Sequence, residues 1–156
     1  MMHSPPPAAD KLAALFPEPV SGYSYTPSLR IGAALLVLLA LGFALTSWFQ
    51  GLGPSTGAGA LILAVSAGMA ASGWYIVMGK TTVDASGINQ EWIMPKTYRW
   101  EEIYRAKLIR LPMNTRLMLN TGRPPFKTVH AGTPELKVAF EKVADLYTRT
   151  AALHQQ

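Results

Sequence analysis

The chain carries no Asp, Glu, Lys or Arg between residues 31 and 78, and this charge-free stretch limits the possible folds more than any other feature. It holds two apolar runs, residues 31–49 and 57–78, separated by a loop rich in glycine. Each run is close to the roughly 20 residues that a helix needs to cross the hydrocarbon of a bilayer. Unpaired backbone groups are costly in lipid, so helices are the expected spanning form. We therefore predict a two-helix transmembrane hairpin within residues 27–79, with these runs as its spans.

Two other structures would also produce long apolar runs. A buried helical hairpin of a soluble protein is disfavoured because two such runs occur in tandem. A cleavable signal peptide is disfavoured because the first run follows a proline-rich segment instead of a compact basic start. We expect residues 1–26 to form a flexible, proline-rich head, in which residues 8–16 have the composition of a short helix on the membrane surface.

Lysine and arginine are distributed unevenly around the two runs. All of them except Lys11 and Arg30 lie from Lys80 onward, and the loop between the runs has none. Cytoplasmic segments next to membrane spans carry an excess of these residues. Both termini are therefore expected in the cytoplasm, and the loop on the outside.

The second run contains a ridge of small residues at intervals of four: Ala60, Ala64, Gly68 and Ser72. Such a ridge lets another helix backbone approach closely. We interpret it as the surface that packs against the first span of the same chain, with a homodimer or a partner subunit as the alternative. Neither span holds an ionisable residue, which argues against a pump or a channel.

The pattern changes after the second run, where short β-prone segments alternate with turn residues. A helix is predicted over residues 134–152, because Thr133 suits the N-cap, Pro134 suits the first turn and apolar residues recur at helical spacing. Residues 80–156 are therefore expected to form a small α+β domain, an antiparallel β-barrel or sandwich covered by its C-terminal helix. The candidate strands are 81–85, 88–94, 97–100, 105–111, 116–120 and 126–130.

Two segments of this domain, VDASGI at residues 83–88 and YRWEEI at 98–103, resemble the signature of bacterial pleckstrin-homology-like (PH-like) domains. These domains often follow a two-helix membrane hairpin. The later Leu117-x-Leu119 pair with Gly122 is similar to that family as well. The resemblance implies a two-sheet barrel capped by the helix, in the bacterial cytoplasmic (inner) membrane, and it does not imply an enzyme. The tail is short for the usual seven strands, so one strand is expected to be very short or missing.

Catalytic patterns are weak in this sequence. There is no cysteine, which excludes disulfides and thiol nucleophiles, and the three histidines lack the spacing of metal ligands. Glu101 and Glu102 are interpreted as a solvated turn, and His130 as a surface or half-buried residue. We therefore expect no enzyme activity, no cofactor and no metal.

Basic residues are frequent in the strand region, and the tether at Lys80 holds them near the membrane. Each Lys or Arg near an anionic leaflet can contribute about 1 kcal/mol to binding. We hypothesise that they contact anionic lipid headgroups or a protein partner, with an ordinary solvated face as the alternative. Nucleic-acid binding is not expected. The residues are Lys96, Arg99, Arg105, Lys107, Arg110, Arg116, Arg123 and Lys127.

These observations favour a non-enzymatic integral membrane protein. Its cytoplasmic PH-like domain would bind a protein partner or an anionic membrane surface, in a scaffolding, recruitment or sensing role. One alternative is an accessory subunit of a larger bacterial membrane complex, packed through its transmembrane helices. A cryptic enzyme is the other alternative, and the sequence offers no constellation that supports it.

Overall fold

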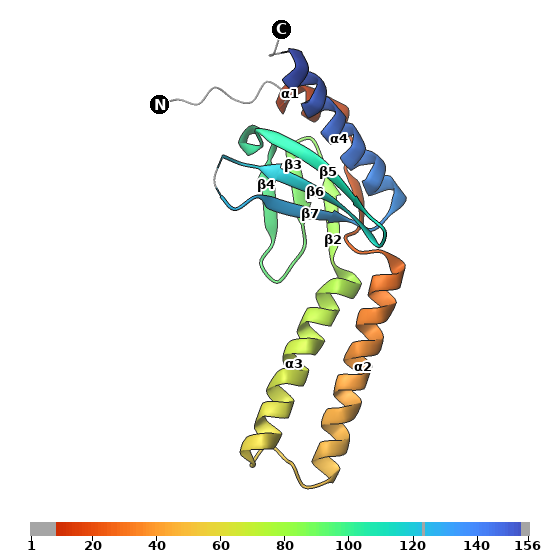
Figure 1. The fold of residues 1–156 in the computed structure, drawn as a ribbon, viewed down its shortest axis with the longest axis vertical. Coiled ribbons are helices and arrows are strands. Elements are labelled where there is room, and N and C mark those ends of the chain that lie inside the picture. Colours follow the sequence, from red (N-terminus) through yellow and green to blue (C-terminus); the bar gives the residue numbers. More distant parts are fainter. Residues whose placement is uncertain (1–8, 123, 154–156) are drawn as a thin grey trace. The chain divides into compact units, whose positions relative to one another are not determined.

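The structure is a computed structural model that describes residues 9–122 and 124–153 (Figure 1). The chain divides into two compact units. One unit is the continuous segment Pro27–Met78. The other combines residues on both sides of it, so the helical unit is inserted into a discontinuous domain.

The helical unit consists of α2 (Pro27–Phe49) and α3 (Gly57–Met78), which run side by side in Figure 1. Both are long enough and apolar enough to cross a membrane, with mean hydropathies of 2.2 and 1.7. Only 6% of the apolar stretch of α2 and 11% of that of α3 are buried, whereas a core helix of a soluble protein is mostly buried. Large apolar side chains are exposed along them, among them Leu38, Leu39, Phe43, Leu61 and Trp74.

The contact between α2 and α3 is a seam of small residues. On α3, Ser66 and Gly73 are buried seven residues apart, the spacing of a helix–helix seam, whereas the buried Gly59 lies against the loop carbonyls of Leu52 and Gly53. A Cβ atom at Gly73 would collide with the side chain of Val37, so glycine allows the close approach there. The Ser66 hydroxyl donates to the Ala40 carbonyl at 3.4 Å.

The ridge predicted from the sequence does not form this seam. Ala60, Ala64, Gly68 and Ser72 are all exposed on α3. The interpretation that they pack against the first span of the same chain is therefore wrong. The physical reason is their place around the helix: each lies one or two residues from a buried position of α3, and successive residues of a helix are about 100° apart. Contact with another chain stays a prediction.

The N-terminal segment is part of the folded domain. It forms α1 (Ala9–Leu15) and β1 (Val20–Tyr23), and β1 pairs antiparallel with β2 (Lys80–Val83). Leu12 and Phe16 are buried, and the ring of Phe16 stacks on Trp100 at 6.1 Å between centroids.

The prediction of a flexible head over residues 1–26 is therefore wrong for residues 9–26, while residues 1–8 lie outside the described residues. The expected short helix exists, but it lies on the domain core and buries Leu12. The sequence could not reveal this because the partners of the segment lie across the helical insertion.

The domain contains a four-stranded and a three-stranded antiparallel sheet, in the orders β1-β2-β3-β4 and β5-β6-β7. The six predicted tail strands are confirmed, five of them with shifted ends, and the N-terminal segment adds β1 to the first sheet. A short 3-10 helix, η1 (Trp100–Glu102), joins the two sheets. The remaining strands are β3 (Gly87–Gln90), β4 (Lys96–Arg99), β5 (Arg105–Leu111), β6 (Asn114–Asn120) and β7 (Lys127–Ala131).

The C-terminal helix α4 (Pro134–Leu153) confirms the predicted helix and packs against β1 and β5 (Figure 1). The phenol of Tyr147 donates to the Ile103 carbonyl at 2.8 Å, which ties the helix to the segment after η1. Burial raises the pKa of that phenol far above its ordinary value. The apolar stripe of α4 that enters the core is Leu136, Phe140, Val143 and Tyr147.

The two signature segments contact each other and have a structural role. The Trp100 indole donates to the Asp84 carbonyl at 2.9 Å, and the Asp84 carboxylate accepts from the amides of Ser86 and Gly87. Partial burial acts to raise the pKa of Asp84, but hydrogen bonds from Ser86, Gly87 and Asn89 outweigh it and hold the pKa below its ordinary value. A Cβ at Gly87 would collide with the Tyr98 carbonyl, so this turn requires glycine.

Candidate binding surfaces

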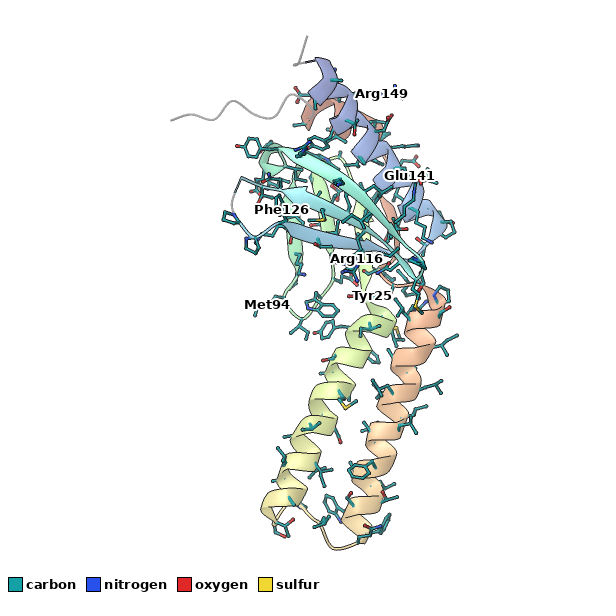
Figure 2. The ribbon with its side chains drawn as sticks, in the orientation of Figure 1. Tyr25, Met94, Arg116, Phe126, Glu141 and Arg149 are labelled. Atoms are coloured by element: carbon teal, nitrogen blue, oxygen red, sulfur yellow. The ribbon has the colours of Figure 1, made fainter. Side chains whose placement is uncertain are left out.

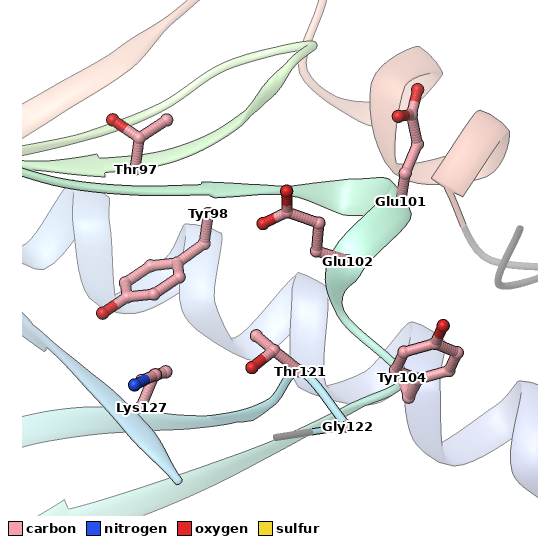
Figure 3. Close-up of a pocket in the computed structure, with 8 residues that line it drawn as sticks. All are labelled: Thr97, Tyr98, Glu101, Glu102, Tyr104, Thr121, Gly122 and Lys127. Atoms are coloured by element: carbon pink, nitrogen blue, oxygen red, sulfur yellow. The ribbon is translucent and has the colours of Figure 1, made fainter. Parts of the chain in front are cut away.

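A cavity of about 800 Å³ lies on the domain between β4 and the segment that joins β6 to β7 (Figure 3). We call it the β4 cavity. It lies beside β4, which is the last strand of the four-stranded sheet. An edge strand presents backbone N–H and C=O groups that no neighbouring strand uses. The lining residues are Thr97, Tyr98, Glu101, Glu102, Tyr104, Thr121, Gly122 and Lys127.

The lining of the β4 cavity combines aromatic rings with carboxylates. Glu101 and Glu102 are exposed on η1, which confirms the predicted solvated turn. The Tyr98 phenol is a neutral hydrogen-bond donor at physiological pH, and burial raises its pKa further above that range. Lys127 is the one basic side chain among the eight lining residues. Carboxylates beside tyrosine rings suit a segment that carries cationic side chains.

The basic residues predicted as one contact face are divided among several places. Lys127 lines the β4 cavity, and Arg99 is exposed on β4. Arg105, Lys107 and Arg110 line a groove between β5 and α4 that also contains acidic side chains.

In that groove, Arg110 forms an ion pair with Glu141 at 2.8 Å, so its charge is partly matched. Lys96 and Arg116 are close enough to His130 to affect its pKa. Arg123 lies outside the described residues. The predicted face is therefore reduced to small groups, of which the pair Lys96 and Arg116 lies beside an aromatic cluster.

That aromatic cluster was not predicted from the sequence. The ring of Tyr25 stacks on His130, with centroids 5.2 Å apart, and lies 6.2 Å from the ring of Trp92. The three residues come from the segment after β1, the β3–β4 loop and β7. Burial raises the pKa of Tyr25, and the nearby Arg116 acts in the opposite direction. No local pattern could have joined residues so distant in sequence.

His130 is half-buried in this cluster, as the sequence predicted. Burial lowers its pKa to about 4, helped by the positive charges of Arg116 and Lys96. The Asn114 amide nitrogen lies 3.0 Å from Nδ1 of His130, and it can donate only when Nδ1 carries no proton. With a pKa lowered this far, His130 is neutral at physiological pH in the folded domain.

We expect acid to destabilise the domain through His130. Folding lowers the pKa of His130. Its contribution to the free energy of unfolding is therefore fully present above the pKa of the unfolded chain, about 6.5, and is lost as the pH falls toward the pKa of the folded chain. The free energy of unfolding should decrease when the pH is lowered from about 7 to about 5. We expect this decrease to be about 1 kcal/mol smaller in His130→Gln, after a discount for solvent exposure. Urea unfolding of the two full chains in detergent micelles, at both pH values, measures this difference. Equal pH dependence in both chains would contradict it.

Among residues 9–122 and 124–153, no group of three or more His, Cys, Asp or Glu side chains is placed to hold a metal ion. Comparison of the chain with protein-family models, curated proteins and solved structures gives no match.

Proposed function

We propose that this protein is a membrane-anchored, non-enzymatic binding module. In this proposal α2 and α3 span the bacterial inner membrane, both termini are cytoplasmic, and the discontinuous domain is a PH-like domain whose β4 cavity binds a segment of a protein partner. The observation that carries it is the place of the insertion. The helical unit connects β1 to β2, and these two strands pair directly with each other.

This connection makes the tether short at both ends. Tyr23 pairs with Lys80, and the Ser24 amide donates to the Gly79 carbonyl at 3.0 Å. Only residues 24–26 separate β1 from α2, and only Gly79 separates α3 from β2. A domain attached by two such short connections stays at the membrane surface, as a scaffolding or recruitment role requires.

Three features support the PH-like assignment. Four strands and three strands form the two sheets, and one C-terminal helix packs on them. The signature segments form the turn at Asp84 and its contact with Trp100. The strand that the tail lacks is present as β1, on the other side of the insertion. The membrane assignment is supported by the exposed apolar side chains of both long helices, a surface that water does not favour.

The β4 cavity supports a protein segment as the bound molecule. An extended segment can add to the free edge of β4 through backbone hydrogen bonds, while side-chain pockets supply specificity. Glu101 and Glu102 lie at the end of that strand and favour basic side chains in the segment. The partner we propose is therefore an extended protein segment with Lys or Arg.

A photo-crosslinking experiment tests this proposal. Replacement of Tyr104, which lines the cavity, by p-benzoylphenylalanine is expected to give a specific adduct in native membranes. Adding Glu101→Lys with Glu102→Lys should reduce the adduct by about tenfold or more, since each like-charge contact costs about 1 kcal/mol. Glu135→Lys is the matched control, because Glu135 is exposed on α4 and does not line the cavity. An adduct that survives the charge reversal at Glu101 and Glu102 would contradict the proposal. An adduct that Glu135→Lys reduces as much as the charge reversal does would also contradict it.

One observation favours the accessory-subunit alternative. The small-residue ridge on α3 is exposed within the helical unit and is therefore available for a helix of another chain. Close packing of helix backbones at small residues is a common basis of helix association in membranes. The two functions are compatible, because the ridge and the β4 cavity lie in different units of the chain.

A further inference from the structure

We propose that the domain has a second membrane contact, formed by two apolar loop tips that insert into the interfacial layer of the bilayer. Together the two tips are called the tip wedge, which consists of residues 92–94 in the β3–β4 loop and residues 111–113 at the β5–β6 turn. The proposal rests on the membrane anchoring proposed above. It adds a lipid-binding site in the soluble domain, apart from the β4 cavity.

Both tips expose large apolar side chains. In the β3–β4 loop, Ile93 is 52% exposed and Met94 is 77% exposed. At the end of β5 and in the turn that leads to β6, Leu111 is 42% exposed and Met113 is 59% exposed. Turns in water are usually made of Gly, Asn, Asp, Ser and Pro. Four large apolar residues at two such sites indicate a contact that removes them from water.

The two tips are joined through the residues just before α2. The ring of Tyr25 contacts that of Trp92 in the first tip, and the Thr26 hydroxyl donates to the Met113 carbonyl at 2.9 Å in the second. Thr26 directly precedes Pro27, the first residue of α2. Both tips are therefore within a few residues of the point at which the chain leaves the domain for its apolar helices.

The first tip is also joined to the point at which the chain returns. The Glu91 amide donates to the Lys80 carbonyl at 2.8 Å, and Lys80 follows α3 after one residue. The tips thus lie beside both connections to the helical unit. A surface at this position is close to the headgroup layer when α2 and α3 cross the bilayer.

The charge around the tips suits an anionic membrane. Three basic residues lie on β2, β4 and β6, near the aromatic cluster: Lys80, Lys96 and Arg116. Glu91 is the acidic residue beside the first tip. Each cation near an anionic leaflet favours binding. Trp92 and Tyr25 have apolar rings with a polar edge, which suits the same depth. Figure 2 labels Tyr25, Met94 and Arg116 in this region.

Insertion of the tips leaves the far end of the second sheet free. In that sheet Leu111 pairs with Asn114 at one end, and Arg105 pairs with Asn120 at the other. The β6–β7 loop, with the exposed Phe126, follows Asn120 at the second end (Figure 2). Thr121 and Gly122 of this loop line the β4 cavity. This part of the cavity is therefore at the end of the second sheet that is farther from the second tip.

Site-specific labelling tests the tip wedge. The chain has no cysteine, so Met94→Cys, Met113→Cys, Phe126→Cys and Leu38→Cys each create one labelling site. The full chains are labelled with an environment-sensitive fluorophore and reconstituted in nanodiscs of phosphatidylcholine and phosphatidylglycerol. We expect lipid-attached quenchers to act several-fold more strongly at positions 94 and 113 than at position 126. Phe126 is the matched control, since it is 62% exposed and apolar.

The position in α2 separates the two proposals. Strong lipid quenching at Leu38→Cys supports the anchoring, and its loss would overturn the membrane span itself. A different result would overturn the tip wedge alone. In that result, lipid quenching is strong at position 38, and positions 94 and 113 are as exposed to water as position 126. Protection of both tips from an aqueous quencher without lipid quenching would also overturn it, because protein would then cover them.

Discussion

Replacing residues 27–78 by a short Gly- and Ser-rich turn is expected to give a soluble, cooperatively folded domain. The two ends of the insertion are adjacent, because the Ser24 amide donates to the Gly79 carbonyl and β1 pairs with β2. A turn at this position converts the two strands into an ordinary antiparallel hairpin. By contrast, residues 80–156 expressed alone are expected not to fold.

The reason is the core that the fragment loses. Leu12 and Phe16 are buried in the domain core, and β1 is one of four strands in its sheet. Loss of a buried Leu or Phe side chain costs about 2–5 kcal/mol each, against a total stability of about 5–15 kcal/mol for a domain. Thermal unfolding followed by circular dichroism measures both chains. A cooperative transition of residues 80–156 alone would contradict the discontinuous domain. The absence of a cooperative transition in the chain without residues 27–78 would also contradict it.

Leu12→Ala is expected to reduce the free energy of unfolding by about 2–5 kcal/mol. Leu12 is fully buried against the core, although it lies in a segment whose sequence indicates a flexible head. Leu15→Ala is the matched control, because Leu15 lies in the same helix and is 40% exposed. The same substitution there should cost less than about 1 kcal/mol, since surface changes are small.

Urea unfolding of the full chain in detergent micelles measures both substitutions. The signal is near-ultraviolet circular dichroism, to which Trp100 contributes as a buried ring stacked on Phe16. Comparable small losses at Leu12 and Leu15 would mean that α1 does not belong to the core. Comparable large losses would mean that the two faces of α1 are equally important, contrary to their burial.

Local patterns were sufficient for much of this fold. The apolar runs predicted α2 and α3, and the spacing of Leu136, Phe140, Val143 and Tyr147 predicted α4. The strand β5 was predicted with its observed ends. These elements are long or strongly periodic, so each of them is recognisable without knowledge of its neighbours.

The incorrect predictions concern contacts between distant segments. β1 has four residues, and its partner β2 lies beyond the whole helical insertion. α3 carries two repeats of small residues, and only the contact of Gly73 with Val37 decides which of them meets α2. The candidate sites have the same origin, because the β4 cavity and the Tyr25 cluster each combine residues from segments far apart in the sequence.

The amino-acid sequence by itself determined that this chain has two long apolar helices, a strand-rich tail and a C-terminal amphipathic helix. Those properties follow from composition and periodicity, which act over a few turns of chain. The tertiary structure alone decided that the N-terminal segment completes the domain and that the apolar tips lie beside its two connections to the helices. The physical reason is that burial and strand pairing depend on which surfaces meet, and residues far apart in sequence supply those surfaces.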